Sequence, residues 1–338
     1  MFYSAPAWLP GGHAQTIWSA LYARSHRGFK TTKQRERWQT PDNDFIDVDW
    51  YFASRIDRPL LVLFHGLEGS SGSHYAQSFA DWSVLHDINM ALPHFRGCSG
   101  EINLAPRAYH SGDHQEINWI LQKFRQEHQT HGGKSLFAVG VSLGGNALMR
   151  WAGEHGRSAA QTVDAIASIC APLDLTKSGE AIGQGLSRHL YTRMFLQSMK
   201  PKARAKWAQH PGLFDLERLM AAKDLYEFDN IFTAPVHGFK NTKDYWLKAS
   251  AKPLMRNIRI PALALNAQND PFVPVLSLPQ SHEVSSTVTL WQPEQGGHVG
   301  FPEGRWPGHV FGLPDAVGGW LLEASGGKDG NKPELKHG

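Results

Sequence analysis

The sequence predicts an α/β fold built on a mainly parallel sheet, and three observations support this prediction. Short apolar runs rich in Val, Leu and Ile recur along the 338 residues, and amphipathic segments lie between several of them. Hydrophobic residues make up 41% of the chain and charged residues 19%, which is typical of a globular protein. Strands that alternate with helices form parallel sheets covered on both faces.

The strands of this sheet can be placed from their composition. Residues 35–40 and 45–52 alternate polar and apolar side chains, which predicts an antiparallel hairpin ahead of the parallel part. The runs that follow are short and apolar throughout, as buried parallel strands are. They cover residues 59–66, 88–95, 135–142, 163–172, 260–267 and 286–293.

Three segments between the strands predict amphipathic helices, because their apolar residues recur every three or four positions. These segments are residues 74–87, 112–128 and 144–156. The interval 173–257 interrupts the alternation, since it has two helical stretches and no strong strand candidate. We interpret it as a helical insertion that caps an active site, because long excursions from a compact domain are often functional. Surface helices with no role in binding are the alternative.

The chain is expected to form a single domain over residues 1–325, followed by a disordered tail over 326–338. The net charge is +3 and no long basic cluster occurs, which argues against a nucleic-acid partner. The two cysteines and the absence of a CxxC motif argue against a disulfide framework and a cysteine-based zinc site. No signal peptide or membrane-length apolar run is evident, so a cytoplasmic, non-inserted protein is expected, with a monomer as the default.

A serine stands where a buried strand should pass into a helix. Residues 140–144, Gly-Val-Ser-Leu-Gly, match the G-x-S-x-G pattern of a nucleophile held at a tight strand-to-helix turn. The flanking glycines give the backbones room to approach, and the helix N-terminus favours negative charge near the Ser142 hydroxyl. An ordinary helix N-cap is the alternative interpretation of Ser142.

A nucleophilic serine needs a base, and the required partners follow in the expected order of serine, acid and histidine. Asp270 and His298 each lie just past a predicted strand, at the edge where catalytic groups gather in α/β sheets. His298 would accept the Ser142 proton, and Asp270 would orient the imidazole. Asp270 could instead cap a turn, His298 could be a surface histidine, and Asp174 is a rival acid.

Two loops could supply backbone donors for an oxyanion. The Leu143 amide follows the nucleophile directly, and the Leu67 amide lies in the glycine-flanked loop 65–69 after an early strand. A simple glycine turn is the alternative for that loop. No cofactor and no metal are expected, because the spacing of His110 and His114 matches no strong metal pattern.

Two further residues have simpler interpretations than catalysis. Asp113 stands at the head of a predicted helix and should act as a helix N-terminal residue. Cys98 lacks an obvious second histidine and is not expected to be a nucleophile. The segments 6–18 and 95–101 could line a pocket or brace the sheet edge, and bracing is favoured.

The chain resembles the α/β-hydrolases, and within them the YheT-like branch of hydrolases. The motifs that carry the likeness are GGHAQTIW, LFHGLEGSSGSHY, PHFRGCSGE, GVSLGGNAL, YEFDNIFTAPVHGF, NDPFVP and GGHVGF. The resemblance implies a serine hydrolase with the triad Ser142, Asp270 and His298. Relatives in this branch include lipid-active esterases and enzymes making medium-chain esters, so acyl esters, small or lipid-like, are the implied substrates.

The leading hypothesis is therefore a serine esterase that cleaves carboxylic esters through an acyl-serine intermediate. An acyltransferase that passes the acyl group to an alcohol is the alternative, because the same triad serves both reactions. A silent hydrolase fold used only for binding is a third possibility, which the complete triad disfavours.

Overall fold

One eight-stranded sheet forms the centre of this computed structural model, which describes residues 2–28 and 31–326. The strand order is β1-β2-β4-β3-β5-β6-β7-β8. β1 and β2 form the predicted antiparallel hairpin, and the six strands from β4 to β8 in that order run parallel. The bounds are β1 Gln34–Gln39, β2 Phe45–Tyr51, β3 Leu60–Phe64, β4 Asn89–Pro93, β5 Leu136–Val141, β6 Ala165–Ile169, β7 Ala262–Leu265 and β8 Val288–Trp291. The predicted strands are thus confirmed; β1 is shifted by one residue toward the N-terminus, and the others are shorter than predicted by one to five residues.

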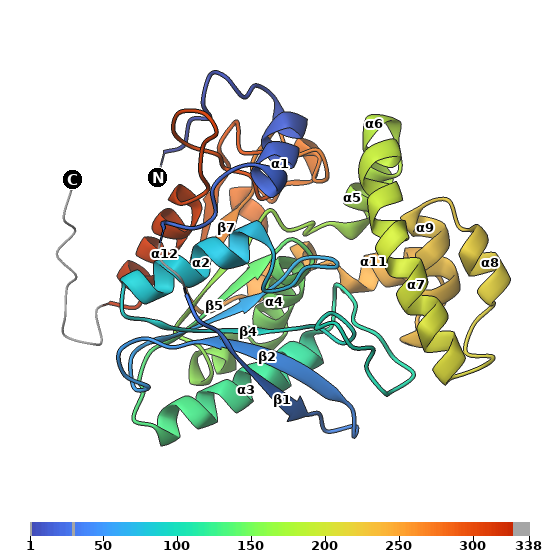
Figure 1. Cartoon of the computed structure of the whole chain (residues 1–338), viewed down its shortest axis with the longest axis horizontal. Helices are drawn as coiled ribbons and strands as arrows, with labels where there is room; N and C mark the ends of the chain where they lie inside the picture. The colour runs from blue at the N-terminus through green and yellow to red at the C-terminus, as the bar shows by residue number, and fades with distance from the viewer. Residues whose placement is uncertain (1, 29–30, 327–338) are drawn as a thin grey trace.

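Helices cover both faces of the sheet (Figure 1). α3 (His114–Thr130) and α4 (Leu143–His155) bury their apolar side chains against one face, together with Val62 and Ala138. α2 (His74–Leu85) and α12 (Gly312–Ala324) cover the other face, together with Leu63 and Val139. Adjacent strand residues point to opposite faces, so each central strand contributes to both apolar cores.

A helical insertion separates β6 from β7 and lies beside the sheet, at the right of Figure 1. Its elements are α5 Leu175–Ile182, α6 Gly185–Ser187, the π-helical turn Arg188–Thr192, α7 Arg193–Gln209, α8 Leu216–Ala221, α9 Leu225–Phe228, the π-helical turn Asp229–Thr233, α10 Ala234–Val236, α11 Thr242–Ala249 and the 3₁₀ turn Lys252–Asn257. The insertion has a small apolar core of its own, centred on Leu196, Leu219 and Phe228. All the elements that the structure describes between β6 and β7 are helices or helical turns, and they lie within the interval 173–257 that the sequence analysis interprets as an insertion.

The N-terminal helix α1 (Gly12–Leu21) was not expected from the sequence and lies close to α2. α12 was likewise unexpected, because its interior holds Gly318 and Gly319, which weaken helix propensity. Apart from Gly326, the tail predicted to be disordered lies outside the described residues. Among helices in the described parts of the chain, none is both long enough and apolar enough to cross a bilayer.

Candidate active site

Ser142 occupies a strained turn between β5 and α4. Its backbone angles, φ 52° and ψ −116°, lie outside the regions that non-glycine residues normally adopt, at a cost of about 1–3 kcal/mol. A Cβ added to Gly144 would come within 2.6 Å of the carbonyl oxygens of Phe64 and His65, so only glycine fits there. The turn therefore brings the loop after β3 directly against the serine.

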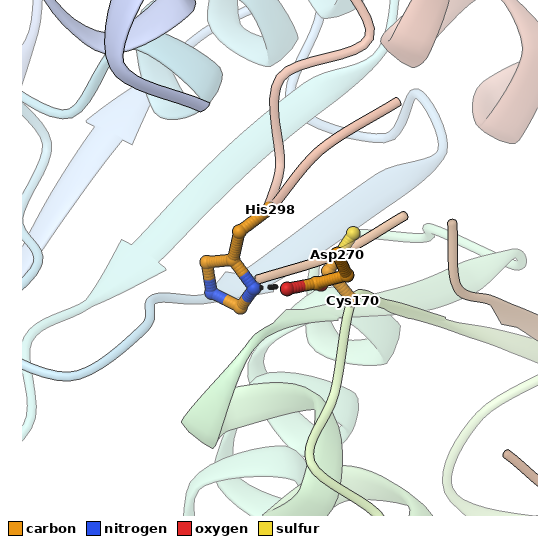
Figure 2. A group of neighbouring side chains, drawn as sticks. All are labelled: Cys170, Asp270 and His298. Carbon is orange, nitrogen blue, oxygen red and sulfur yellow. Dashed lines mark hydrogen bonds and ion pairs between the residues drawn. The ribbon is translucent and has the colours of Figure 1, made fainter. Parts of the chain in front are cut away.

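A continuous chain of hydrogen bonds joins the three candidate catalytic residues. Ser142 Oγ lies 2.9 Å from His298 Nε2, and His298 Nδ1 lies 2.8 Å from Asp270 Oδ2. The second Asp270 oxygen accepts the backbone N–H groups of Phe272, at 2.7 Å, and Val273, at 3.3 Å. These bonds fix the carboxylate, and Figure 2 shows His298 turned edge-on toward it. The structure brings together the three residues that the sequence singled out.

Cys170 lies beside this pair in a buried position (Figure 2). Its Sγ accepts the backbone N–H of Val299 at 3.3 Å, next to the histidine. Cys170, Asp270 and His298 could together reach one metal ion, since their ligand atoms all lie within 4.8 Å of one another. However, burial raises the pKa of the Cys170 thiol well above its usual value, which opposes the thiolate a metal would need. The Nδ1 of His298 also already faces the carboxylate.

Both predicted oxyanion donors line the same cavity as Ser142. Within the described residues, neither the Leu67 nor the Leu143 backbone N–H donates a hydrogen bond. The N–H groups on either side of Leu67 are engaged, by Tyr75 and Tyr109 hydroxyls. The Leu143 N–H lies at the N-terminus of α4 and the Leu67 N–H in the loop after β3, and unpaired backbone N–H groups of this kind are suited to stabilise developing negative charge.

Helix α1 holds the acid and histidine loops, a role that the sequence did not reveal. Thr16 Oγ1 accepts the backbone N–H of His298 at 2.8 Å. Gln15 Oε1 accepts hydrogen bonds from the Asn269 side chain at 3.0 Å and from Gly296 N at 2.9 Å. Gln15 is fully buried and Thr16 nearly so. In these contacts, segment 6–18 supports the loops that carry Asp270 and His298.

A cavity of about 1210 Å³, counting the space open to solvent at its mouth, adjoins Ser142 and His298. The helical insertion supplies about half of the lining residues, and most of those are apolar. They include Leu175, Ile182, Phe195, Met199, Leu225, Phe228, Phe232 and Trp246. Asp229 also lines it, and burial raises the pKa of this carboxyl to about 6. A mainly apolar cavity with few polar groups is suited to an apolar ligand.

The amino-acid sequence of the whole chain is similar to those of known proteins. Residues 59–305 match the family described as the alpha/beta hydrolase fold. The chain belongs to the α/β-hydrolase fold family. YheT of Escherichia coli (strain K12) is 34% identical over 313 residues, which cover 91% of this chain and 89% of YheT. Phospholipase ABHD3 of Mus musculus is 29% identical over 297 residues, covering 83% of this chain and 70% of ABHD3.

Among solved structures, the Pyrococcus furiosus esterase Pf2001 has a TM-score of 0.54 to this α/β-hydrolase-fold chain at 17% sequence identity. The match covers 87% of this chain and 93% of Pf2001. At that identity the likeness concerns the fold, and it agrees with the predicted α/β-hydrolase architecture.

The loop 95–101 of this α/β-hydrolase-fold protein both braces the sheet and lines the cavity. Arg96 lies in the cavity wall, and its guanidinium is bound by Asp42, Asp44 and Glu116 at 2.8 Å each. A buried cation with three carboxylate partners holds the loop to the strand hairpin and to α3.

Lys202 connects the insertion to the loop that carries Leu67. Its Nζ lies 2.8 Å from a carboxylate oxygen of Glu68, whose other oxygen accepts the Tyr109 hydroxyl at 2.9 Å. Lys202 Nζ also lies 3.6 Å from Cys98 Sγ. Burial raises the pKa of Cys98 to about 11, so its thiol stays protonated and is a poor nucleophile.

The remaining candidates have structural roles. Asp174, the rival acid, caps α5 by accepting the backbone N–H of Lys177 at 3.1 Å, whereas the two ring nitrogens of His298 face Asp270 and Ser142. Asp113 caps α3, as predicted. His110 packs against His237, and burial lowers the pKa of His110 to about 3. Of the described residues, only the Cys170 group gathers three metal-ligating side chains, so His110 and His114 are not part of one.

Proposed function

We propose that this chain is a serine hydrolase that cleaves carboxylic esters through an acyl-serine intermediate. The observation that carries the proposal is the unbroken hydrogen-bond chain from Ser142 through His298 to Asp270. The similarity to the phospholipase ABHD3 of Mus musculus supports ester chemistry. Serine, imidazole and carboxylate in this arrangement make a neutral hydroxyl a usable nucleophile.

In the first half of the reaction, Ser142 Oγ bonds to the carbonyl carbon while its proton moves to His298 Nε2. The carbonyl π electrons move to the oxygen, whose negative charge the Leu67 and Leu143 N–H groups stabilise. Asp270 stabilises the imidazolium that forms. When the tetrahedral intermediate collapses, the ester C–O bond breaks and His298 gives its proton to the departing alkoxide, which leaves as an alcohol.

In the second half, water attacks the acyl-serine carbonyl and gives a proton to His298 Nε2. Collapse of this intermediate breaks the bond to Ser142 Oγ, which recovers the proton. A carboxylic acid is released and the site returns to its starting state. We propose that the insertion acts as a cap whose apolar wall receives the acyl chain, because Phe195, Met199 and Phe228 face the same cavity as the serine.

A fluorophosphonate probe tests the proposal, because it reacts only with an activated serine. We expect wild-type protein to be labelled and Ser142→Ala to remain unlabelled at equal protein concentration. Ser168→Ala, which removes a buried serine hydroxyl on β6, is the matched control and should label like wild type. Unlabelled wild type, or equal labelling of Ser142→Ala, would contradict the assignment and favour a fold used for binding.

A further inference from the structure

A second functional surface lies on the outside of the helical insertion, where α6, the π-helical turn 188–192 and α7 form one nearly continuous helical stretch. Figure 1 shows α6 projecting at the top right of the molecule and α7 running below it, between the sheet-bearing body and α8. Leu186, Leu190 and Met194 are 57%, 41% and 52% exposed on this stretch. Side chains four residues apart lie on one side of a helix, so the three form an exposed apolar stripe.

The same stretch is strongly basic. Residues 181–214 contain no Asp or Glu, and their six basic residues are Arg188, Arg193, Lys200, Lys202, Arg204 and Lys206. Lys202 and Lys206 turn inward, to Glu68 and to the carbonyl oxygens of Asn103 and Ala105. The arginines remain exposed.

These arginines are left with little charge compensation. Arg188 reaches Asp224 at 3.9 Å, whereas Arg193 and Arg204 form no ion pair with any residue that the structure describes. A groove between α7 and α8 gathers Arg188, Arg193, Lys200, Arg204 and Lys223, and no acidic side chain lines it.

One face of α7 lines the cavity and the other is exposed on the surface. Phe195, Met199 and Ala203 face the cavity that holds Ser142, at helical spacing. Met194, Arg193 and Arg204 face outward. A surface that contacts the outward side would lie about one helix diameter, about 10 Å, from the cavity.

We infer that this outer face docks the protein on an anionic lipid bilayer. The docking face consists of Leu186, Arg188, Leu190, Arg193, Met194 and Arg204. Exposed leucines beside arginines match the interfacial helices that bury apolar side chains at the headgroup boundary while basic groups bind anionic lipids. A bilayer fits better than a protein groove, because exposed cations lie on the same helical stretch as the apolar stripe and, among the described residues, only Arg188 has an acidic partner, Asp224 at 3.9 Å. The inference deepens the proposed function by naming lipid esters as the substrates within reach of the cavity.

Vesicle co-sedimentation with the full chain tests the inference. We expect binding to vesicles of equal parts phosphatidylglycerol and phosphatidylcholine, little binding to phosphatidylcholine alone, and a loss of binding at about 0.5 M NaCl through screening. Leu186→Ser/Leu190→Ser and Arg188→Gln/Arg193→Gln/Arg204→Gln should each lower the partition coefficient at least about ten-fold. No binding of wild type, or equal binding to both vesicles, would overturn the inference.

Matched control variants distinguish docking through this face from nonspecific binding to vesicles. Ile56→Ser/Leu85→Ser removes two similarly exposed apolar side chains from the sheet-bearing body, and Lys134→Gln/Arg157→Gln/Arg256→Gln removes three exposed cations there. Both should bind like wild type. A loss in these controls equal to that in the docking variants would contradict a specific face.

Catalytic activity is measured separately, as turnover of a short water-soluble nitrophenyl ester. The docking variants should retain wild-type turnover of this ester, which also shows that they fold. Ser142→Ala should bind vesicles normally while losing turnover. Normal turnover without vesicle binding would overturn docking alone, whereas binding without turnover or fluorophosphonate labelling would overturn the proposed function alone.

Discussion

At the scale of single residues, Asp270 is held from two sides. One carboxylate oxygen faces His298 Nδ1, and the other accepts two backbone N–H groups of its own loop. The carboxylate therefore has one orientation available, and it can impose one orientation and one tautomer on the imidazole.

Replacing Asp270 by Asn should lower kcat for ester hydrolysis by about 10³–10⁴-fold, because an amide can donate to Nδ1 and favour the wrong tautomer. The measurement is steady-state hydrolysis of a nitrophenyl ester, with circular dichroism to verify folding. Asp174→Asn removes the rival acid and serves as control, with kcat within about two-fold of wild type because it only caps α5. A larger loss for Asp174→Asn than for Asp270→Asn would reverse the assignment.

Asp229 gives a prediction for stability against pH. Burial raises the pKa of its carboxyl to about 6, so the folded protein keeps this proton at pH values where the unfolded chain has lost it. The free energy of unfolding should therefore decrease as the pH rises from 4 to 6, and this one carboxyl should account for roughly 2 kcal/mol of the decrease. Above about pH 7, where the carboxyl is ionised in the folded and the unfolded protein, this destabilisation should remain constant.

Asp229→Asn should remove that part of the slope and stabilise the protein at pH 7.5, while Asn can still accept from Trp246 Nε1 through its carbonyl oxygen. Urea unfolding at about pH 4.5 and 7.5 measures this difference. Glu217→Gln, an exposed change on α8, provides the comparison. Identical pH slopes in wild type and Asp229→Asn would show that the carboxyl is not protonated in the folded state.

Ser142, Asp270 and His298 could be singled out from the sequence because each follows a strand whose composition is easy to recognise. The sheet then places all three at one edge. Their catalytic roles stay predictions until the labelling experiment. Gln15 and Thr16 could not be found in this way, because their partners lie more than 250 residues away and no local pattern marks a contact of that range.

At the scale of elements, α1 acts as a clamp on two loops. Thr16 Oγ1 is the acceptor for the His298 backbone N–H, and it also donates to the Gly12 carbonyl at 2.7 Å. Loss of the hydroxyl would leave a nearly buried N–H without a partner, which costs about 1–3 kcal/mol.

Thr16→Val should lower kcat at least about ten-fold with little change in KM, because small displacements of a catalytic group are costly and Thr16 does not line the cavity. Thr16→Ser keeps the hydroxyl and should retain most of the activity. Steady-state kinetics on both variants measure the effect. A fall in stability with unchanged kcat would show that α1 supports the fold without positioning His298.

The glycine that follows the serine turn gives a second prediction at this scale. Gly144→Ala should destabilise the protein by about 1–3 kcal/mol or more, because its Cβ would meet two backbone carbonyl oxygens at 2.6 Å. Gly319→Ala in α12 is the matched control, with no atom within 4 Å of the new Cβ, and it should gain about 0.5–1 kcal/mol. Urea unfolding compares them, and equal stability of the two variants would contradict the close approach at the turn.

The sequence predicted the strands of this protein better than its helices. Buried parallel strands are uniformly apolar, and the structure places all six where composition indicated. α12 was missed because Pro314, Gly318 and Gly319 interrupt its pattern, and α1 because it has only ten residues and begins directly after Pro10 and Gly11. Tertiary packing compensates for the weak helix propensity of such segments. The insertion was recognisable as helical, but its division into short helices and π-helical turns depends on packing that no periodicity encodes.

At the scale of the whole molecule, the cavity lies between the sheet-bearing body and the insertion, so side chains from both bear on its size. We expect kcat/KM for nitrophenyl esters to rise with acyl chain length, by up to about four-fold per buried methylene, until the chain fills the cavity. Met199→Trp adds volume inside and should lower the rate for long esters more than for acetate. Met194→Trp, on the outer face of the same helix, should leave the series unchanged, and equal series for all three proteins would argue against this cavity as the acyl site.

The clamp formed by α1 also affects the order in which the protein becomes active during its synthesis. In the chain, α1 precedes its partners at Asn269, Gly296 and His298 by more than 250 residues, so it is synthesised well before them. Most strands of the sheet can pair before those loops have been made. The contacts of α1 with the loops, and the placement of His298, can form only afterwards. If the proposed mechanism holds, a nascent chain that already contains Ser142 has no base to activate it, and hydrolysis can begin only after the His298 loop has been made and has bound α1.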